Sequence, residues 1–425
     1  MDSSEDSTQS KVTRRGLLTA GGAALVGAAG GVVLGRATAP GAPVADVPAP
    51  AAATPSPRPS VSEVNAAGAS ARQTIDFHGV HQAGVDTPEQ TYAVFLGLNL
   101  ASNSAQDADS VLRIVSDDAA RLMAGEPALG DTEPEIAKVP ARLSFTIGLG
   151  HSLFEKTGRS DMVPTFFPTI PAFSTDELDD YWSSTDFLVQ IASDDPLTLA
   201  HAQRMVLKDL STLTTVQWAQ PGFRSPTPAN EGGRAGRNMM GQVDGTVNPL
   251  PGTAQFDTVV WSNGDAVWSA GGTVVVLRRI RMLLDEWDQM DVGAKELVIG
   301  RTLDTGAPLG GEDETDEVRF DVLDENGLPV IPSNAHMRVA HADSDEEMIL
   351  RRPYTYDAGF VDGRQDVGLI FAAYTADPQR SFIPMQERIA EMDAFNRWNT
   401  TIGSSTYFIP PGCAEGDYVA SGVFA

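Results

Sequence analysis

The sequence predicts an α+β fold made of two similar lobes, each an antiparallel sheet with flanking helices. Apolar, strand-like runs alternate with segments in which apolar residues recur at helical spacing, and this alternation occurs twice along the chain. Residues 223–237, a stretch dense in proline, glycine and arginine, separate the two halves. This order favours two related lobes joined by an irregular crossing.

In the first half, two apolar runs predict strands, at residues 90–100 (QTYAVFLGLNL) and 141–149 (ARLSFTIGL). Helical spacing of apolar residues predicts helices over residues 107–125 and 197–210.

In the second half, the corresponding strands are expected at residues 272–284 (GTVVVLRRIRMLL) and 366–374 (DVGLIFAAY). Helical patterns cover residues 296–300 and 382–398. The second half therefore repeats the elements of the first.

The composition excludes several classes of function. The chain has 425 residues with 30 Lys+Arg against 57 Asp+Glu, a formal net charge of −27. This acidity disfavours binding to nucleic acid, or to a membrane surface through a basic patch. The single cysteine, Cys413, excludes an internal disulfide and any multi-thiolate metal or iron–sulfur site.

Residues 1–39 are predicted to be a twin-arginine export signal. Arg14 and Arg15 precede a weakly hydrophobic, glycine- and alanine-rich stretch at residues 17–35. A membrane anchor is the alternative, since the stretch approaches the roughly 20 residues that span a bilayer. Its glycines and alanines make insertion less favourable. We therefore expect export to the periplasm, the cell envelope or the medium, with membrane attachment only if the signal stays uncleaved.

Residues 40–70 are rich in alanine, proline and serine, a composition that predicts a linker without a core. The first lobe is expected over residues 71–230 and the second over residues 231–425. Twin-arginine export carries proteins that are already folded, often with a cofactor inserted before export. The predicted signal is therefore a first indication that this protein binds a cofactor.

The second half holds the denser group of residues that can do chemistry. Asp244 lies in RNMMGQVDGTVNP (residues 237–249), where flanking glycines allow a tight turn and the close approach of a cofactor. A plain Asp-Gly turn is the alternative. His336 and the arginine pair Arg351 and Arg352 lie some fifteen residues apart. No histidine pair has the His-Glu-x-x-His spacing of a zinc site.

Seven segments, in order along the chain, resemble the dye-decolourising (DyP-type) haem peroxidases, specifically their exported deferrochelatase/peroxidase subfamily. The family's Gly-x-x-Asp-Gly motif is matched by Gly241, Asp244 and Gly245. The resemblance implies two ferredoxin-like lobes and one haem b per chain, held mainly by the second lobe. The matching segments are residues 77–88, 146–154, 216–223, 237–249, 299–310, 336–356 and 367–387.

The resemblance also implies roles for individual residues. His336 is expected to be the proximal ligand of the haem iron, Asp244 the distal acid–base residue and Arg351 the distal arginine. Arg352 is the alternative if the alignment shifts by one residue. Two short stretches are expected to contact the haem, namely Gly245, Thr246 and Val247, and His341, Ala342 and Asp343. A carboxylate that hydrogen-bonds His336 is expected within residues 387–393.

These residue types suit peroxide chemistry. A neutral imidazole ligates haem iron and leaves the opposite face open. An ionised carboxylate can take a proton from one peroxide oxygen and return it to the other, so that water leaves. A neighbouring guanidinium favours the ionised carboxylate and stabilises charge on the departing oxygen.

We therefore expect an exported haem b peroxidase that reduces hydrogen peroxide and oxidises dyes, phenols and other small aromatic reductants. Two alternatives stay open: a deferrochelatase that releases iron from haem and leaves the porphyrin intact, and a haem-carrying redox partner of an iron-uptake permease. A homo-oligomer also stays open. Aromatic residues of the second half are interpreted as core residues or as an electron relay, namely Trp261, Trp268, Trp287, Tyr354 and Tyr356.

Overall fold

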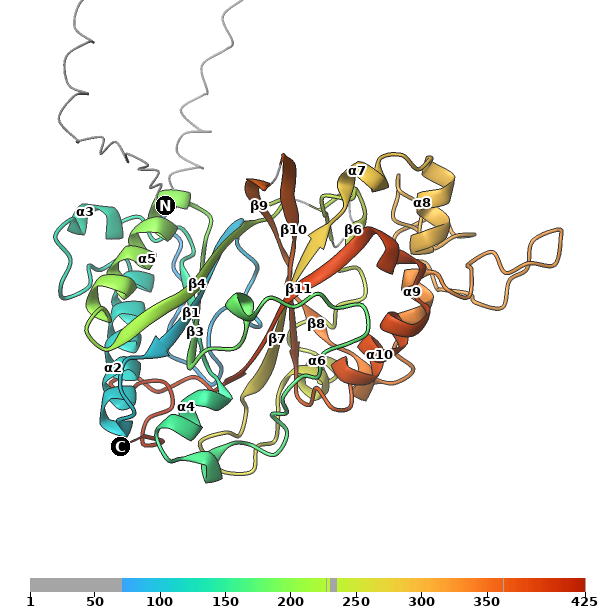
Figure 1. Cartoon of the computed structure of the whole chain (residues 1–425). Helices are drawn as coiled ribbons and strands as arrows, with labels where there is room; N and C mark the ends of the chain where they lie inside the picture. Colours follow the sequence, from blue (N-terminus) through green and yellow to red (C-terminus); the bar gives the residue numbers. More distant parts are fainter. Residues whose placement is uncertain (1–70, 227, 230–234, 362, 425) are drawn as a thin grey trace, which may run out of the picture. The chain divides into compact units, whose positions relative to one another are not determined.

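The computed structural model describes residues 71–226, 228–229, 235–361 and 363–424 (Figure 1). The predicted export signal (1–39) and linker (40–70) lie outside these residues, as does the predicted lobe boundary at residues 230 and 231. In the part of the chain that the structure describes, no helix is long and apolar enough to cross a membrane.

The first sheet is antiparallel, with its strands in the order β2-β3-β1-β4. Two helices connect the strands so that the chain follows the ferredoxin-like order β1-α2-β2-β3-α5-β4. Short helices α3 (Pro134–Ala137) and α4 (His151–Lys156) lie in the connections. The main elements are β1 (Tyr92–Leu100), α2 (Ala105–Met123), β2 (Ser144–Leu149), β3 (Phe187–Ser193), α5 (Pro196–Asp209) and β4 (Thr214–Phe223).

Helices α2 and α5 cover the outer face of this sheet. The Ser104 hydroxyl caps α2 by accepting from the Asp107 amide, and the Asp195 carboxylate caps α5 by accepting from the Thr198 amide. Apolar side chains of the helices and strands form one core, which includes Val111, Leu112, Val115, Met205, Val206, Leu96, Leu98, Phe145, Ile147, Val189 and Ile191. The outer face of the first sheet is thus used for packing.

The second sheet repeats this topology, with its strands in the order β9-β10-β7-β11. The short strand β8 (Leu350–Arg351) precedes β9 along the same edge of β10. The strands are β7 (Thr273–Met282), β9 (Tyr354–Val361), β10 (Arg364–Thr375) and β11 (Asn399–Ile409), and β5 (Gly236–Arg237) pairs with β6 (Val243–Asp244) in a separate small sheet. The helices are α6 (Ala254–Val260), α7 (Leu284–Trp287), α8 (Val292–Ile299), α9 (His336–Val339) and α10 (Phe382–Met392).

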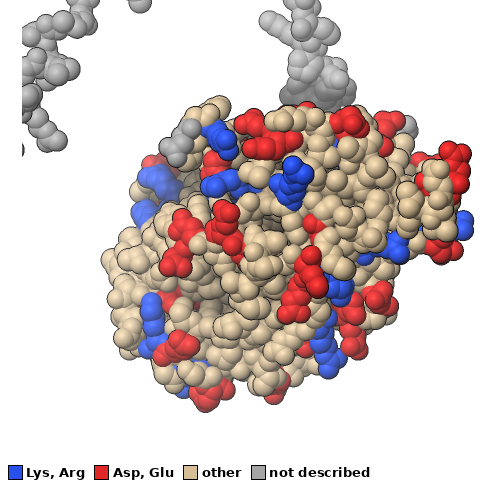
Figure 2. All heavy atoms as spheres, turned by 45° about the vertical axis from the view of Figure 1, so that its right-hand side comes forward, with Lys and Arg blue, Asp and Glu red and all other residues tan. Residues whose placement is uncertain are grey.

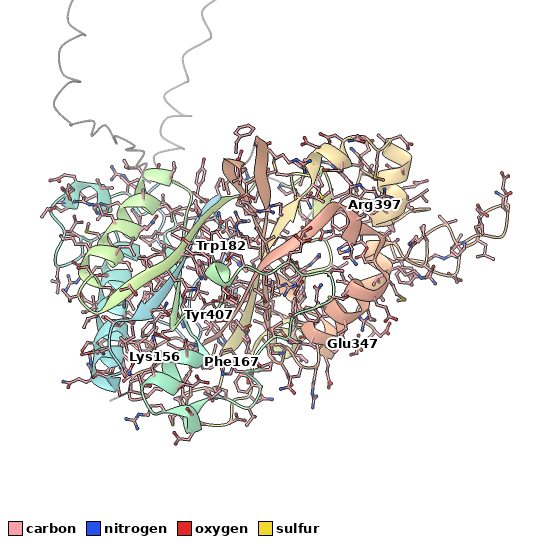
Figure 3. The ribbon with its side chains drawn as sticks, in the orientation of Figure 1. Lys156, Phe167, Trp182, Glu347, Arg397 and Tyr407 are labelled. Atoms are coloured by element: carbon pink, nitrogen blue, oxygen red, sulfur yellow. The ribbon has the colours of Figure 1, made fainter. Side chains whose placement is uncertain are left out.

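The inner faces of the two sheets pack against each other. One residue pair joins the sheets at each side, Phe223 with Thr355 and Phe408 with Leu149. Tyr407 of β11, labelled in Figure 3, is fully buried, and its hydroxyl accepts from the Thr185 amide at 3.0 Å. The shared core includes Phe95, Leu188, Val275, Leu277, Tyr354, Ile370 and Tyr374. Because this inner space is filled, a functional pocket in the second lobe must use the outer face or the edges of its sheet.

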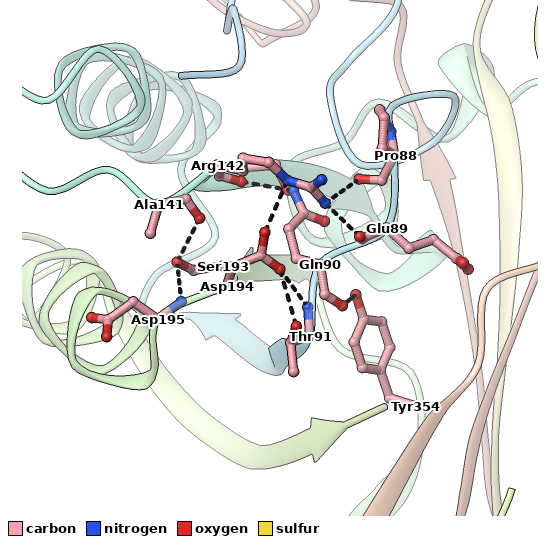
Figure 4. Close-up of polar contacts among 11 residues, drawn as sticks. Pro88, Glu89, Gln90, Thr91, Ala141, Arg142, Ser193, Asp194, Asp195 and Tyr354 are labelled. Carbon is pink, nitrogen blue, oxygen red and sulfur yellow. Dashed lines mark hydrogen bonds and ion pairs between the residues drawn. The ribbon is translucent and has the colours of Figure 1, made fainter. Parts of the chain in front are cut away.

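A polar network links a strained turn of the first lobe to the second sheet (Figure 4). Ala141 and Arg142 have φ angles of 44° and 55°, a conformation that costs on the order of 1 kcal/mol or more for residues other than glycine. The Arg142 guanidinium lies 3.0 Å from the Asp194 carboxylate, and the Arg142 carbonyl accepts from the Gln90 amide at 2.8 Å. The Tyr354 hydroxyl of β9 donates to the Gln90 carbonyl at 3.1 Å. The two lobes therefore share one hydrogen-bond network.

The structure confirms the predicted α+β class and the type of each predicted element. The predicted helix at residues 382–398 is divided at Asp393, where α10 ends and a 3-10 turn begins. The sequence analysis missed β3, β4, β9 and β11. These strands do not share one apolar pattern: every residue of β3 is buried, whereas β4 contains Pro221 and β11 is rich in serine and threonine.

Asp118 on α2 provides a test of the outer core of the first lobe. Burial, together with the nearby Asp209 carboxylate, raises the pKa of Asp118 from 3.8 to about 7. Because this pKa is raised in the folded state, stability falls as the pH rises from about 4 to about 7. We expect Asp118→Asn to stabilise the protein by about 1–4 kcal/mol at pH 8 and to leave it nearly unchanged at pH 4.

Urea denaturation at pH 4 and pH 8 measures this difference. Asp117→Asn is the matched control, because the neighbouring Asp117 side chain is half-exposed and pairs with Arg121. An equal stability change for Asp118→Asn at both pH values would contradict the expectation.

Candidate functional site

Asp244 and Arg351 meet beside the second sheet. Asp244 ends β6 and Arg351 ends β8, so the two residues come from segments more than one hundred residues apart. A guanidinium Nη1 of Arg351 donates to Oδ1 of Asp244 at 3.2 Å. The Asp244 side chain is 20% exposed and the Arg351 side chain 23% exposed. The pair is thus shielded from bulk water but still accessible to a small molecule.

Arg352 directly follows β8, and its side chain has other partners than that of Arg351. It is buried, and its Nη1 donates to the Thr87 carbonyl at 2.8 Å. Among the described residues, its Nε and Nη2 make no hydrogen bond. The geometry therefore favours Arg351 over Arg352 as the partner of Asp244.

The loop after Asp244 contains the other predicted residues of this segment. Gly245 has a φ of 119°, which favours glycine at this position. Its carbonyl accepts from the Asn248 amide at 3.1 Å, which closes a turn. Thr246 is buried and donates to the Glu314 carboxylate at 2.9 Å, whereas Val247 is 57% exposed.

His336 begins α9 and pairs with a buried carboxylate. Its Nδ1 lies 2.5 Å from Oδ2 of Asp393. The Asp393 side chain is 1% exposed and the His336 side chain 33% exposed. Among the described residues, the side-chain hydrogen bond of this ring is the one at Nδ1. An imidazole held in this way presents Nε2 to a ligand.

Opposing effects determine the pKa of His336. Burial lowers it, but the charge of Asp393 and its hydrogen bond together outweigh burial, so the pKa is raised above 6.5. The charges of Arg351 and Asp244 also act on the ring. We therefore treat His336, Asp244 and Arg351 together as the candidate site.

Arg301 places a second cation beside Arg351. Its Nη1 donates to the carbonyls of Gly306 and Glu314, at 2.7 and 3.0 Å. Burial lowers the pKa of Arg301, the charge of Arg351 lowers it further, and Glu314 opposes both. Two neighbouring guanidinium groups favour an anion near them.

A cavity of about 320 Å³ adjoins this cation. Its lining includes Thr246, Val247 and Asn248 of the loop after Asp244. Arg301, Glu314 and Asp316 also line it. On the face shown in Figure 2, basic side chains lie in the upper part and also in the lower and right-hand parts, interspersed with acidic side chains.

The predicted stretch of His341, Ala342 and Asp343 lies in the loop after α9. His341 and Asp343 are exposed. The His341 ring packs edge-on against Phe320 at 5.1 Å between centroids, and its carbonyl accepts from Arg388. Within the described residues, the structure gives this stretch no hydrogen bond or ion pair to Asp244 or Arg351. It therefore stays a prediction.

Sequence reasoning missed Arg301 and Asn248 and gave Asp393 only as one acidic residue within 387–393. Asp393 lies 57 residues from His336 in sequence, so spacing offered no signal for the pairing. Arg301 lies in residues 299–310, a segment that carried the family resemblance, but no role was attached to it.

Models of two halves of one family match the chain in order. Dyp-type peroxidase, N-terminal, matches residues 82–224, and Dyp-type peroxidase, C-terminal, matches residues 235–414. A dye-decolorizing peroxidase of Thermobifida fusca (strain YX) is 36% identical over 431 residues, with 97% of each chain covered. The chain belongs to the DyP-type peroxidase family. It is an enzyme of that family, as the sequence analysis predicted.

Other members of this family show the same relationship. A deferrochelatase of Escherichia coli (strain K12) is 30% identical over 366 residues, covering 81% of this chain and 86% of its own. The crystal structure of a DyP-type peroxidase from Cellulomonas bogoriensis has 40% identity and a TM-score of 0.80, covering 84% of this chain and 99% of its own. A Rhodococcus jostii RHA1 DypB variant in complex with heme shares the fold at 20% identity and a TM-score of 0.57, with 77% and 95% covered.

The His336–Asp393 pair can be tested in the ligand-free chain. We expect the His336 ring to titrate above 6.5, and Asp393→Asn to lower its pKa, because the carboxylate stabilises the imidazolium. With a raised folded-state pKa, the pair stabilises the fold most below pH 6.5, and this contribution is lost as the pH rises through the raised value. NMR titration of ¹⁵N-labelled histidine measures the shift. Glu391→Gln, which removes an exposed carboxylate of the same helix end, is the control, and an equal response to both variants would contradict the assignment.

Proposed function

We propose that this DyP-type peroxidase is an exported enzyme that holds one haem b, reduces hydrogen peroxide and oxidises dyes, phenols or other small aromatic reductants. One observation carries the proposal: an imidazole with its Nε2 available lies in the same site as the Asp244–Arg351 pair, whose side chains bond at 3.2 Å. This arrangement combines an iron ligand with an acid–base pair.

The residues present fit haem. In the described part of the chain, no cluster of three or more His, Cys, Asp or Glu side chains could hold a bare metal ion. A site with one imidazole ligand suits a metal whose equatorial ligands come from a macrocycle. Asp393 would fix the tautomer of His336 and increase its basicity. Arg301, which lines the cavity beside the site, would hold an anionic propionate.

When bound, haem would supply the iron that accepts electrons from reductant and passes them to peroxide. Asp244 would accept the proton from one peroxide oxygen and return it to the other, so that the O–O bond breaks and one oxygen leaves as water. Arg351 would donate to the departing oxygen and stabilise the charge that develops there. The partly buried position of both side chains would strengthen these interactions by excluding most water.

Aromatic side chains around the second lobe are divided between core and surface. Trp287, Tyr354 and Tyr356 are buried, which supports the interpretation of core residues. Trp261 is partly exposed and stacks on His81 with 3.6 Å between ring centroids. Oxidation of reductants too large for the pocket would require an exposed donor site of this kind.

Export is proposed from the sequence of residues 1–39. Arg14 and Arg15 followed by a weakly apolar stretch are typical of the twin-arginine route, and residues 40–70 would separate the signal from the folded enzyme. This route would deliver the enzyme with its cofactor already in place.

Deferrochelatase activity is the second candidate, favoured by the relatives of that name at 30% identity. In this reaction iron leaves haem and protons replace it on the pyrrole nitrogens, in the same pocket. A haem-carrying partner of an iron-uptake permease is the third candidate.

The purified holoprotein would be incubated with peroxide and an anthraquinone dye, and free protoporphyrin would be assayed separately. Dye turnover supports the peroxidase, whereas protoporphyrin without dye turnover supports the second candidate.

We expect His336→Ala to lose most of its haem. The variant lacks the only proposed protein ligand to the iron, while Asp393 keeps a capping bond to the Phe395 amide. Haem content and the absorption spectrum after purification measure the effect, and circular dichroism reports whether the fold is kept. A variant with full haem content and an unchanged spectrum would refute the assignment of His336.

We expect Asp244→Ala and Arg351→Leu to retain haem but to react with peroxide roughly 10² to 10⁴ times more slowly. Stopped-flow spectroscopy of the loaded variants measures the rate. Arg364→Leu removes a 76% exposed guanidinium of the same sheet and is the control. Wild-type rates for both site variants would show that the distal assignment is wrong.

A further inference from the structure

Arg351 lies on an edge of the second sheet. Among the described residues, the one strand that pairs with β8 is β10, and β8 and β9 lie along one edge of β10 with Pro353 between them. The Arg352 amide donates to the Ala372 carbonyl of β10 at 2.9 Å. Neighbouring residues of a strand direct their backbone groups to opposite sides. The amide and carbonyl of Arg351 therefore point away from β10.

The side chain of Asn248 satisfies both of these groups. Its Nδ2 donates to the Arg351 carbonyl at 2.6 Å, and its Oδ1 accepts from the Arg351 amide at 3.1 Å. A carboxamide has one acceptor and one donor side, as a peptide group has. The Asn248 side chain thus makes the two hydrogen bonds to Arg351 that the backbone of a neighbouring strand makes in a sheet.

Asn248 is also connected to Asp244 through a short, closed turn. Its backbone amide donates to the Gly245 carbonyl at 3.1 Å, and only three residues lie between Asp244 and Asn248. One end of the turn carries Asp244 and the other end fixes the backbone of Arg351.

We propose that Asn248 is a positioning residue of the peroxidase site, which sets the distance between Asp244 and Arg351 by clamping the backbone of Arg351. This inference rests on the proposed roles of Asp244 and Arg351. Asn248 acts on peroxide only through Arg351. Its removal leaves the Arg351 backbone without its two partners and lets the guanidinium move away from the carboxylate.

The test compares haem-loaded wild type, Asn248→Ala, Arg351→Leu and the double variant by stopped-flow reaction with hydrogen peroxide. Small displacements of catalytic groups reduce rates by roughly 10- to 100-fold, so this loss is expected for Asn248→Ala at unchanged haem content. Because Asn248 acts through Arg351, the double variant should be no slower than Arg351→Leu alone. A wild-type rate for Asn248→Ala, or losses that multiply in the double variant, would overturn the proposal.

Hydrogen–deuterium exchange of peptides covering residues 348–353 gives a readout independent of activity. Exchange of the Arg351 amide should become faster in Asn248→Ala and change less in Asn248→Asp, which keeps the acceptor but loses the donor. Asn99→Ala is the matched control, since Asn99 also makes two side-chain hydrogen bonds, in the first lobe. An unchanged exchange rate of the Arg351 amide in Asn248→Ala would show that the Asn248 side chain does not hold the backbone of Arg351. If Arg351→Leu itself reacts at the wild-type rate, the proposed role of Arg351 fails, and the exchange rates then decide on the clamp separately.

Discussion

Burial of apolar side chains between the two sheets determines which faces of the sheets remain available to a functional site. The inner faces of both sheets contribute to one core, and strand pairing at both sides adds only a single residue pair each. Alternation along a strand means that filling the inner face leaves every second side chain outside. On the first sheet, two long helices cover these outer side chains. On the second sheet, shorter helices and long loops cover them, and the site lies there.

The difference between the lobes explains why two similar topologies have different roles. In the first lobe, α2 and α5 run along the sheet and bury its outer face. In the second, α9 has four residues, and its first residue, His336, faces the site rather than a core. The short helix α9 thus leaves His336 partly exposed beside the second sheet.

Local patterns could be predicted from the sequence, and pairings between distant segments could not. The apolar runs of β1, β7 and β10 and the glycines around Asp244 are local signals, so these elements were predicted. The family resemblance supplied the expected partners Arg351 and His336. Asp393 and Asn248 act through contacts that span 57 and 103 residues, and ordinary helix-end and loop residues carry no pattern that marks such contacts.

The position of β11 has a consequence for the order of folding. This last strand, Asn399–Ile409, pairs along nearly its whole length with β7, which was synthesised more than one hundred residues earlier. Non-local pairings of this kind are slow steps, because a long loop must close before the contacts form. The first sheet can assemble while the chain is still growing. The second sheet, and with it the site around His336, Asp244 and Arg351, is completed only after residues 399–409 have been made. In the proposed function, haem would therefore be captured only after β11 has paired with β7.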